Sequence, residues 1–302
     1  MSSVPPSPYE HPGSPPARPE LPEGVHRDPL PEPEPTKDAL PDWPVWAPFA
    51  GMLVTVIIAL VGITLIAGIV SAGGLDVDPD AQPPGVTIAG TLIQDLGLIV
   101  SALLLAHLTG GRPTARQFGL RVPRLWPAIG WLLLAWGVFL LFSAIWAAAL
   151  NITESDDLPQ ELGADESSTA LAAVAVLVCF VAPITEEFFF RGFCFTALRR
   201  AWGVIPAALA TGVIFGAIHA GGTQVEFLGP LACFGLMLCL LYYWTESLIP
   251  CMILHALNNS LALGVSQDWT WQIPVLMLAA VVAVLAVMLP VARSPRLNAA
   301  AA

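Results

Sequence analysis

The chain has 302 residues, of which 56% are hydrophobic and only 12% are charged, and its formal net charge is −11. Soluble domains carry about 25% charged residues, so this composition excludes an ordinary soluble protein and indicates a polytopic membrane protein. The acidic residues cluster in the N-terminal segment and in two loops, and the sequence has no basic region of the kind that binds nucleic acid.

The N-terminal segment, residues 1–43, is rich in proline and acidic side chains and poor in branched apolar ones. Because such a segment buries too little surface to fold alone, we expect a disordered tail, in preference to a ligand for a partner domain. It lacks the apolar core of a cleavable signal peptide, so the first membrane helix would act as an uncleaved anchor.

Apolar runs of about 20 residues mark membrane-spanning helices, and the sequence contains eight such runs. We therefore predict an all-α fold, a polytopic bundle of about eight transmembrane helices. The transmembrane domain would comprise residues 44–293, followed by a C-terminal tail at 294–302. The expected spans are 46–70, 86–108, 126–150, 170–198, 204–219, 227–244, 248–265 and 273–291.

Basic residues indicate the orientation, because loops rich in Lys and Arg favour the cytoplasmic side. With eight spans, every basic connection falls on the side of both termini, whereas the loops at 76–80 and 156–166 are acidic. Both termini, and with them both tails, are therefore predicted to be cytoplasmic, in the inner membrane if the source is a bacterium. The basic residues that support this prediction are Arg112, Arg116, Arg121, Arg124, Arg199, Arg200, Arg293 and Arg296.

The fourth expected span carries two carboxylates and a guanidinium in the stretch PITEEFFFRG, residues 183–192. A charge at membrane depth costs roughly 2.5–3.5 kcal/mol on insertion scales, so three of them together indicate a use. Glu187 and Arg191 are four residues apart and can pair on one helix face. Glu186 points about 100° away, and an unneutralised carboxylate in an apolar setting suits a general base. The alternative is a structural ion pair beside a solvated Glu186.

Two further spans each carry polar residues in pairs four positions apart: His219 with the aromatic Phe215, and His255 with Asn259. Each is explained singly by an interfacial histidine or by an asparagine that hydrogen-bonds a neighbouring helix. Together with Glu186 they provide the groups for peptide hydrolysis, a base for water and donors for an oxyanion. Glu186, His219 and His255 also suit a divalent metal such as zinc.

Two points stay open in the sequence. Counting 1.5 Å per residue from the cytoplasmic ends places Glu186 and His219 at a depth of roughly 20 Å but His255 at roughly 10 Å, unless a kink at Pro183 or helix tilt compensates. Asp95 in the second span would either line a cavity or make a packing contact, and the structural role is favoured.

The three motifs occur in the order EExxxR, FxxxH and HxxxN, and in this order they resemble the CPBP family. This is the CAAX protease and bacteriocin-processing family of intramembrane endopeptidases, also called Abi. The resemblance covers residues 170–264, the CPBP-like core, and implies a helical bundle whose site opens toward the cytosol. The residues that carry it are Glu186, Glu187, Arg191, Phe215, His219, His255 and Asn259.

The resemblance also implies roles for these residues. Glu186 would activate water with the help of His219, and the second glutamate would support the arginine. His255 and Asn259 would form the oxyanion site. Members are described as metalloproteases, although a metal-free glutamate mechanism has been argued for the fold. Both mechanisms are kept here, with the glutamate mechanism favoured and no certain cofactor.

The expected function is therefore hydrolysis of a peptide bond in a membrane-embedded or lipid-associated protein or peptide, within the lipid bilayer. The sequence shows no prenyl-recognition site, so the prenylated substrates of the family's eukaryotic members are not assigned to this chain. The alternatives are a non-catalytic immunity or scaffold protein and, less favoured, an ion-coupled transporter. No internal repeat of the transporter kind is evident, and the sequence contains neither GxSxG nor GxGD. The motif order favours the enzyme.

Overall fold

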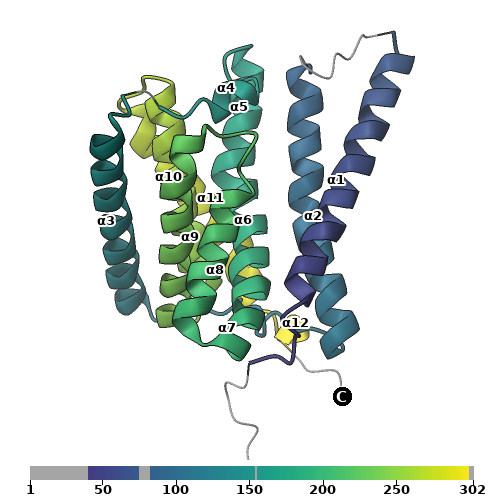
Figure 1. The fold of residues 1–302 in the computed structure, drawn as a ribbon, viewed down its shortest axis with the longest axis vertical. Helices are drawn as coiled ribbons and strands as arrows, with labels where there is room; N and C mark the ends of the chain where they lie inside the picture. Colours follow the sequence, from purple (N-terminus) through teal and green to yellow (C-terminus); the bar gives the residue numbers. More distant parts are fainter. Residues whose placement is uncertain (1–39, 75–81, 154, 299–302) are drawn as a thin grey trace, which may run out of the picture. The chain divides into compact units, whose positions relative to one another are not determined.

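The computed structural model describes residues 40–74, 82–153 and 155–298, and every regular element in these ranges is a helix (Figure 1). The expected tail up to residue 39 lies outside the described residues, as do the whole acidic loop at 76–80 and the last four residues. The described chain belongs to one unit, Leu40–Ala302.

Seven helices of the described ranges are long and apolar enough to cross a membrane. An eighth apolar helix, α8 (Val204–Ala217), has 14 residues and is about 21 Å long. The all-α fold with about eight membrane helices is thus confirmed. The long helices are α1 (Ala47–Ala72), α2 (Pro84–Gly110), α3 (Leu125–Leu150), a composite helix (Ser168–Trp202), α9 (Val225–Thr245), α10 (Leu248–Ser266) and α11 (Gln272–Arg293). Two short helices are α4 (Leu158–Glu161) and α12 (Pro295–Asn298).

The composite helix switches twice from α-helical to π-helical hydrogen bonding and back. It consists of α5 (Ser168–Val176), the π-helical η1 (Leu177–Val181), α6 (Ala182–Glu187), the π-helical η2 (Phe188–Phe195) and α7 (Thr196–Trp202). Short π-helical segments inside α-helices are frequent at functional sites. The two here flank the turn that carries both glutamates of the EExxxR motif.

The centre of the unit is built on η2. Its phenylalanines, with Phe118 from the loop before α3, are almost fully buried, and Phe118 stacks on Phe188 with ring centroids 4.4 Å apart. Trp43, just before α1, packs on Phe118 at 4.8 Å. These aromatic rings fill the space between the composite helix and its neighbours near the end of the bundle at which α7 lies.

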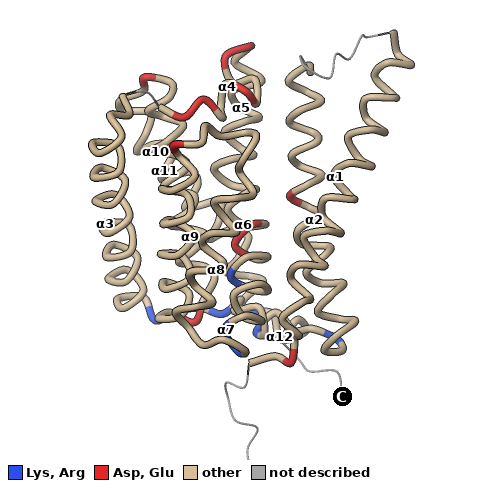
Figure 2. Tube along the Cα trace, viewed as in Figure 1, with Lys and Arg blue, Asp and Glu red and all other residues tan. Residues whose placement is uncertain are grey.

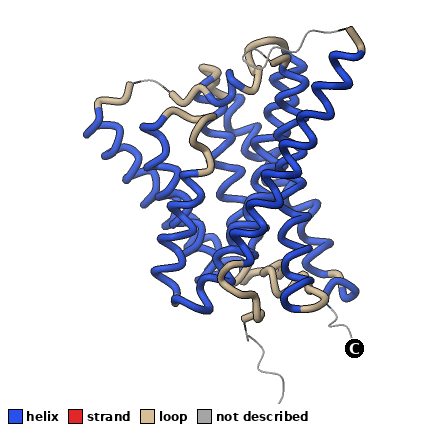
Figure 3. The backbone as a smooth tube through the Cα atoms, turned by 45° about the vertical axis from the view of Figure 1, so that its right-hand side comes forward, coloured by secondary structure: helices blue, strands red, loops and turns tan. Residues whose placement is uncertain are grey.

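Charge is unevenly distributed between the two ends of the helices. Basic residues gather at the end where α7 and α12 lie, and acidic residues gather mainly at the opposite end, around α4 (Figure 2). Both ends of the described chain lie at the basic end, and loops close the bundle at both ends (Figure 3). At the basic end Arg200 forms an ion pair with Asp42, and Arg121 pairs with Glu246 at 3.1 Å.

Candidate active site

A cavity of about 740 Å³ lies between α2, α3, the composite helix, α8, α9 and α10. Of the residues expected at the site, four line it, namely Glu186, His219, His255 and Asn259. Helices that are far apart in the sequence therefore bring these side chains to one cavity. Glu187 and Arg191 lie behind the cavity wall and are fully buried.

Glu187 and Arg191 form a buried ion pair. Arg191 Nη1 lies 2.8 Å from Glu187 Oε1, and Nη2 donates to the carbonyl of Gly235 in α9 at 3.1 Å. The guanidinium also lies 4.5 Å from the ring centroid of Phe215 in α8. The pair thus fixes the composite helix to α8 and α9, as the four-residue spacing predicts.

The same carboxylate holds His255. Oε1 of Glu187 lies 2.8 Å from Nδ1 of His255, and the imidazole has its edge against Phe215 and Phe234. With Glu187 ionised, the proton resides on Nδ1 and the other nitrogen, Nε2, faces Glu186. Its distance to Glu186 Oε2 is 3.9 Å, too long for a direct hydrogen bond and suited to a bridging water.

Glu186 differs from its neighbour Glu187 in its environment. Its side chain is 13% exposed, it lines the cavity, and its Oε2 has no hydrogen-bond partner within the described ranges. The two adjacent glutamates are therefore divided as the spacing predicts, one paired in the protein interior and one facing the cavity.

His219 and Asn259 each have one nitrogen already engaged. Nδ1 of His219 donates to the carbonyl of Phe215 at 2.8 Å, which leaves Nε2 for a ligand. Nδ2 of Asn259 donates to the carbonyl of Val178 at 2.8 Å, which leaves its second N–H. Within the part of the chain that the structure describes, no direct contact joins either side chain to Glu186.

The bond from Asn259 has a cause in the sequence. In η1 the N–H of Ala182 bonds to Leu177, five residues back, instead of to Val178. Residue 183 is proline and has no N–H to offer. The carbonyl of Val178 is thus left without a helical donor, and Asn259 supplies one.

Asp95 is a cavity residue for which the sequence favours a structural role. It lies in α2, is 1% exposed and lines the same cavity. Its Oδ2 has no hydrogen-bond partner among the described residues, and it is close enough to Glu186 for the two charges to interact. The signal that would have found it is the cost of an ionisable side chain inside a membrane span.

Comparison with known families identifies the segment that holds this site. Residues 168–261 match the family model of the type II CAAX prenyl endopeptidase Rce1-like family. The resemblance to the CPBP family is confirmed. The matched segment contains all three motifs, whereas the searches of curated proteins and of solved structures found no match at the significance applied. The CPBP match supports a function of the CAAX-type intramembrane protease kind, in a multi-pass membrane protein.

The cavity of this CPBP segment reaches the acidic end of the bundle. Its outer lining comes from Asp156, Glu161 and Thr223, and none of its lining residues comes from the loops at the basic end. The family resemblance predicts a cytosolic opening, and the basic loops predict cytosolic termini. The two expectations exclude each other, because the cavity is lined by loop residues of the acidic end, whereas both ends of the described chain lie at the basic end (Figure 1).

The fit of a metal to the CPBP residues is poor. Across residues 40–74, 82–153 and 155–298, no three His, Cys, Asp or Glu side chains are grouped so that they could hold a metal ion. Glu186 and His255 face each other, but His219 makes its contact to the backbone of Phe215. The three expected ligands do not form a ready metal site, and no step below depends on one.

Proposed function

We propose that this protein is an intramembrane endopeptidase in which Glu186 activates water for attack on a peptide carbonyl. The observation that carries the proposal is the 3.9 Å gap between Glu186 Oε2 and His255 Nε2 on the cavity wall. Water placed there would donate one proton to the carboxylate, as general-base catalysis requires. The buried pair of Glu187 and Arg191 would hold His255 in place during the reaction.

The proposed reaction uses the remaining side chains as follows. Glu186 takes a proton from water while the water oxygen bonds to the carbonyl carbon. The oxyanion accepts hydrogen bonds from the second N–H of Asn259 and from Nε2 of His255, whose ring would carry a proton on both nitrogens at this step, with Nδ1 held by the Glu187 carboxylate. Nε2 of His219 would orient the water. When the carbon–nitrogen bond breaks, Glu186 passes its proton to the leaving amine, which restores the carboxylate.

The finer assignments of location and substrate are part of the same proposal. Residues 44–293 would form the membrane domain, with residues 1–43 and 294–302 as tails on the cytoplasmic side of the cell membrane. The concentration of Arg at that end supports this orientation (Figure 2). The substrate would be a membrane-embedded or lipid-associated protein or peptide, because the cavity lies among helices that cross the bilayer.

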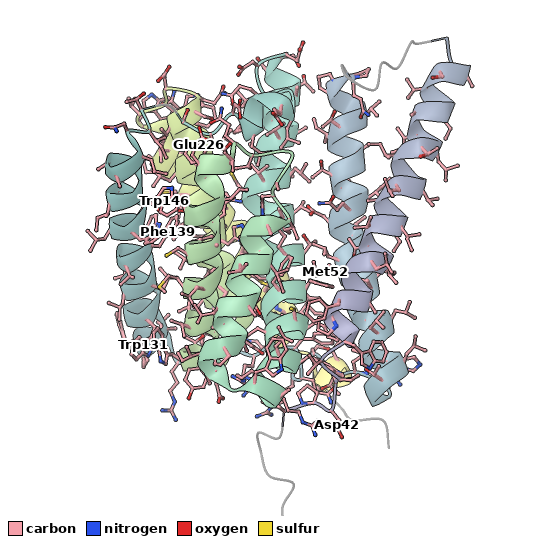
Figure 4. All side chains as sticks on the ribbon, viewed as in Figure 1. Asp42, Met52, Trp131, Phe139, Trp146 and Glu226 are labelled. Carbon is pink, nitrogen blue, oxygen red and sulfur yellow. The ribbon has the colours of Figure 1, made fainter. Side chains whose placement is uncertain are left out.

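The test compares the membrane fractions of cells that express the wild type, Glu186→Gln or Glu226→Gln. Newly formed peptide N-termini are labelled and identified by mass spectrometry. Glu226 lies at the start of α9 (Figure 4) and outside the cavity lining, so it is the matched control. Cleavage products should appear with the wild type and the control and be absent with Glu186→Gln. Equal products from Glu186→Gln would refute the mechanism.

A further inference from the structure

The Asp and Glu residues of the cavity lining have no basic counterpart there. It includes the carboxylates of Asp95, Asp156, Glu161 and Glu186, and none of the lining residues is Lys or Arg. Carboxylates that face a common space in a low-dielectric surrounding repel one another. Acidic side chains thus lie both at the mouth and at the inner wall of the cavity, which also contains the imidazoles of His219 and His255.

The mouth is formed by the loop before α4 and by α4 itself. Asp156 Oδ2 accepts a weak hydrogen bond from Thr223 at 3.4 Å, and Asp157 Oδ2 accepts one from Gln224 at 3.0 Å. Each aspartate keeps a second, buried oxygen without a hydrogen-bond partner among the described residues. Burial raises the pKa of Asp156 and of Glu161, and the charge of Asp157 raises both further.

The inner wall provides a second and independent observation. Asp95 is 1% exposed and lines the cavity, and one of its carboxylate oxygens, Oδ2, has no hydrogen-bond partner among the described residues. A buried carboxylate without a partner costs several kcal/mol. A cation that enters the cavity would meet such groups at its mouth and at its inner wall.

The rest of the lining is largely apolar and aromatic. Phe139 and Trp146 face it from α3 (Figure 4), and Phe227 and Phe234 face it from α9. The indole of Trp146 donates to the carbonyl of Glu226 at 2.8 Å, which fixes α3 to α9 at this wall. A cation that matches this lining also carries apolar groups, as an organic cation does.

We propose that the cavity receives a cationic, amphipathic peptide segment from the acidic end, with Lys or Arg side chains beside Asp156, Glu161 and Asp95. This inference rests on the proposed function and specifies its substrate class. Apolar side chains of the segment would pack on the aromatic walls, while its peptide bond lies at Glu186. The volume of about 740 Å³ falls within the range of about 300–1,000 Å³ typical of ligand sites.

The test uses the full chain in phosphatidylcholine nanodiscs and two fluorescein-labelled 12-residue peptides. One peptide alternates Leu and Lys in an amphipathic pattern, and the other has Gln in place of every Lys. Fluorescence anisotropy should show the Lys peptide binding at least about tenfold more tightly, with the preference shrinking at high salt. Empty nanodiscs give the background that is subtracted. Equal affinity for the two peptides overturns the inference without any variant.

A charge-matched pair of variants then assigns the preference to the mouth. The double variant Asp156→Asn/Glu161→Gln should lower the ratio of the affinity for the Lys peptide to that for the Gln peptide about tenfold. Glu166→Gln with Glu226→Gln removes the same charge from the acidic end outside the cavity lining and should leave the preference unchanged. An unchanged preference in the mouth variant overturns the inference.

Cleavage of the Lys peptide, followed by mass spectrometry, separates the two proposals. Glu186→Gln should bind the peptide and fail to cleave it. If the wild type shows the charge preference and the mouth variant loses it, yet cleavage does not depend on Glu186, the endopeptidase mechanism fails while the cationic site stands. If cleavage depends on Glu186 without a charge preference, the cationic site fails and the mechanism stands.

Discussion

Nε2 of His255 lies 3.9 Å from Oε2 of Glu186, although the two residues come from different helices and are 69 positions apart in the sequence. The other nitrogen of the ring is fixed by Glu187 at 2.8 Å. One glutamate thus positions the imidazole, and the next glutamate lies at a distance from it at which one water molecule can bond to both side chains.

Glu187→Ala should destabilise the fold severely. It leaves Arg191 buried and unpaired and removes the acceptor of His255, and breaking a buried ion pair costs about 3–5 kcal/mol. The measurement is the folded yield and the free energy of unfolding in detergent. The control is Glu246→Gln, which breaks the exposed pair with Arg121 and should cost at most about 1 kcal/mol. Similar losses for both variants would contradict the assigned role.

Asn259→Ala should destabilise the protein by about 1–3 kcal/mol, because the buried carbonyl of Val178 loses its donor. Asn258, which also lines the cavity, is the control and should tolerate the same change. Pro183→Ala restores a backbone N–H near that carbonyl. The cost of Asn259→Ala should therefore be smaller in the Pro183→Ala background, and a double-mutant cycle measures the difference. Additive effects would show that the two residues do not share this carbonyl.

The local arrangement around Val178 illustrates what the sequence could not provide. The apolar runs, the motif spacing and the pairing of Glu187 with Arg191 were predictable, because each depends on residues close in sequence. The bond from Asn259 to Val178 depends on a π-helical turn, which no residue pattern marks in advance. The side of the bundle to which the cavity opens depends on how α2, α3 and α9 pack, and the motifs contain no information on that packing.

The mismatch in depth between His255 and Glu186 has a similar origin. Counting residues assumes that every helix begins at the same level of the membrane. In the structure α10 begins inside the protein, where the N–H of Leu248 donates to the carbonyl of Gly119 at 2.9 Å and Ser247 donates to the carbonyl of Arg121 at 2.6 Å. The loop beneath α10 therefore raises His255 to the level of Glu186. In this loop Gly119 has φ +80°, and a Cβ atom at this position would clash with the side chain of Tyr242.

Asp156→Asn should stabilise the protein at neutral pH. Burial raises the pKa of Asp156 above its usual value of 3.8, so the folded state binds its proton more readily than the unfolded state does. The ionised group therefore destabilises the fold above its raised pKa, and this effect disappears as the pH falls below 3.8. The variant should unfold about 1–3 °C higher at pH 7.5 and at nearly the wild-type temperature at pH 4. A variant that unfolds lower at pH 7.5 would show that Thr223 depends on this carboxylate.

Cleavage should persist after the protein is treated with 1,10-phenanthroline or EDTA and dialysed. Glu186, His219 and His255 do not form a three-ligand group in the structure, and the distance between Glu186 and His255 suits a water held by the two side chains alone. Elemental analysis of the purified protein should find much less than one zinc per chain. Loss of cleavage with the chelator, and its recovery with added zinc, would instead assign the water activation to a metal.

Asp95→Asn should leave the protein as stable as the wild type or more stable, because it removes a buried carboxyl group whose Oδ2 has no partner among the described residues. If Asp95 only made a packing contact, Asp95→Asn would also leave the affinity for the Lys peptide unchanged. Its place on the cavity wall predicts instead that the variant binds the Lys peptide more weakly than the wild type does, at unchanged thermal stability. Asp165→Asn, at the acidic end but outside the cavity lining, is the control. A loss of stability together with unchanged peptide affinity would show that Asp95 supports the packing of α2 and has no part in the site.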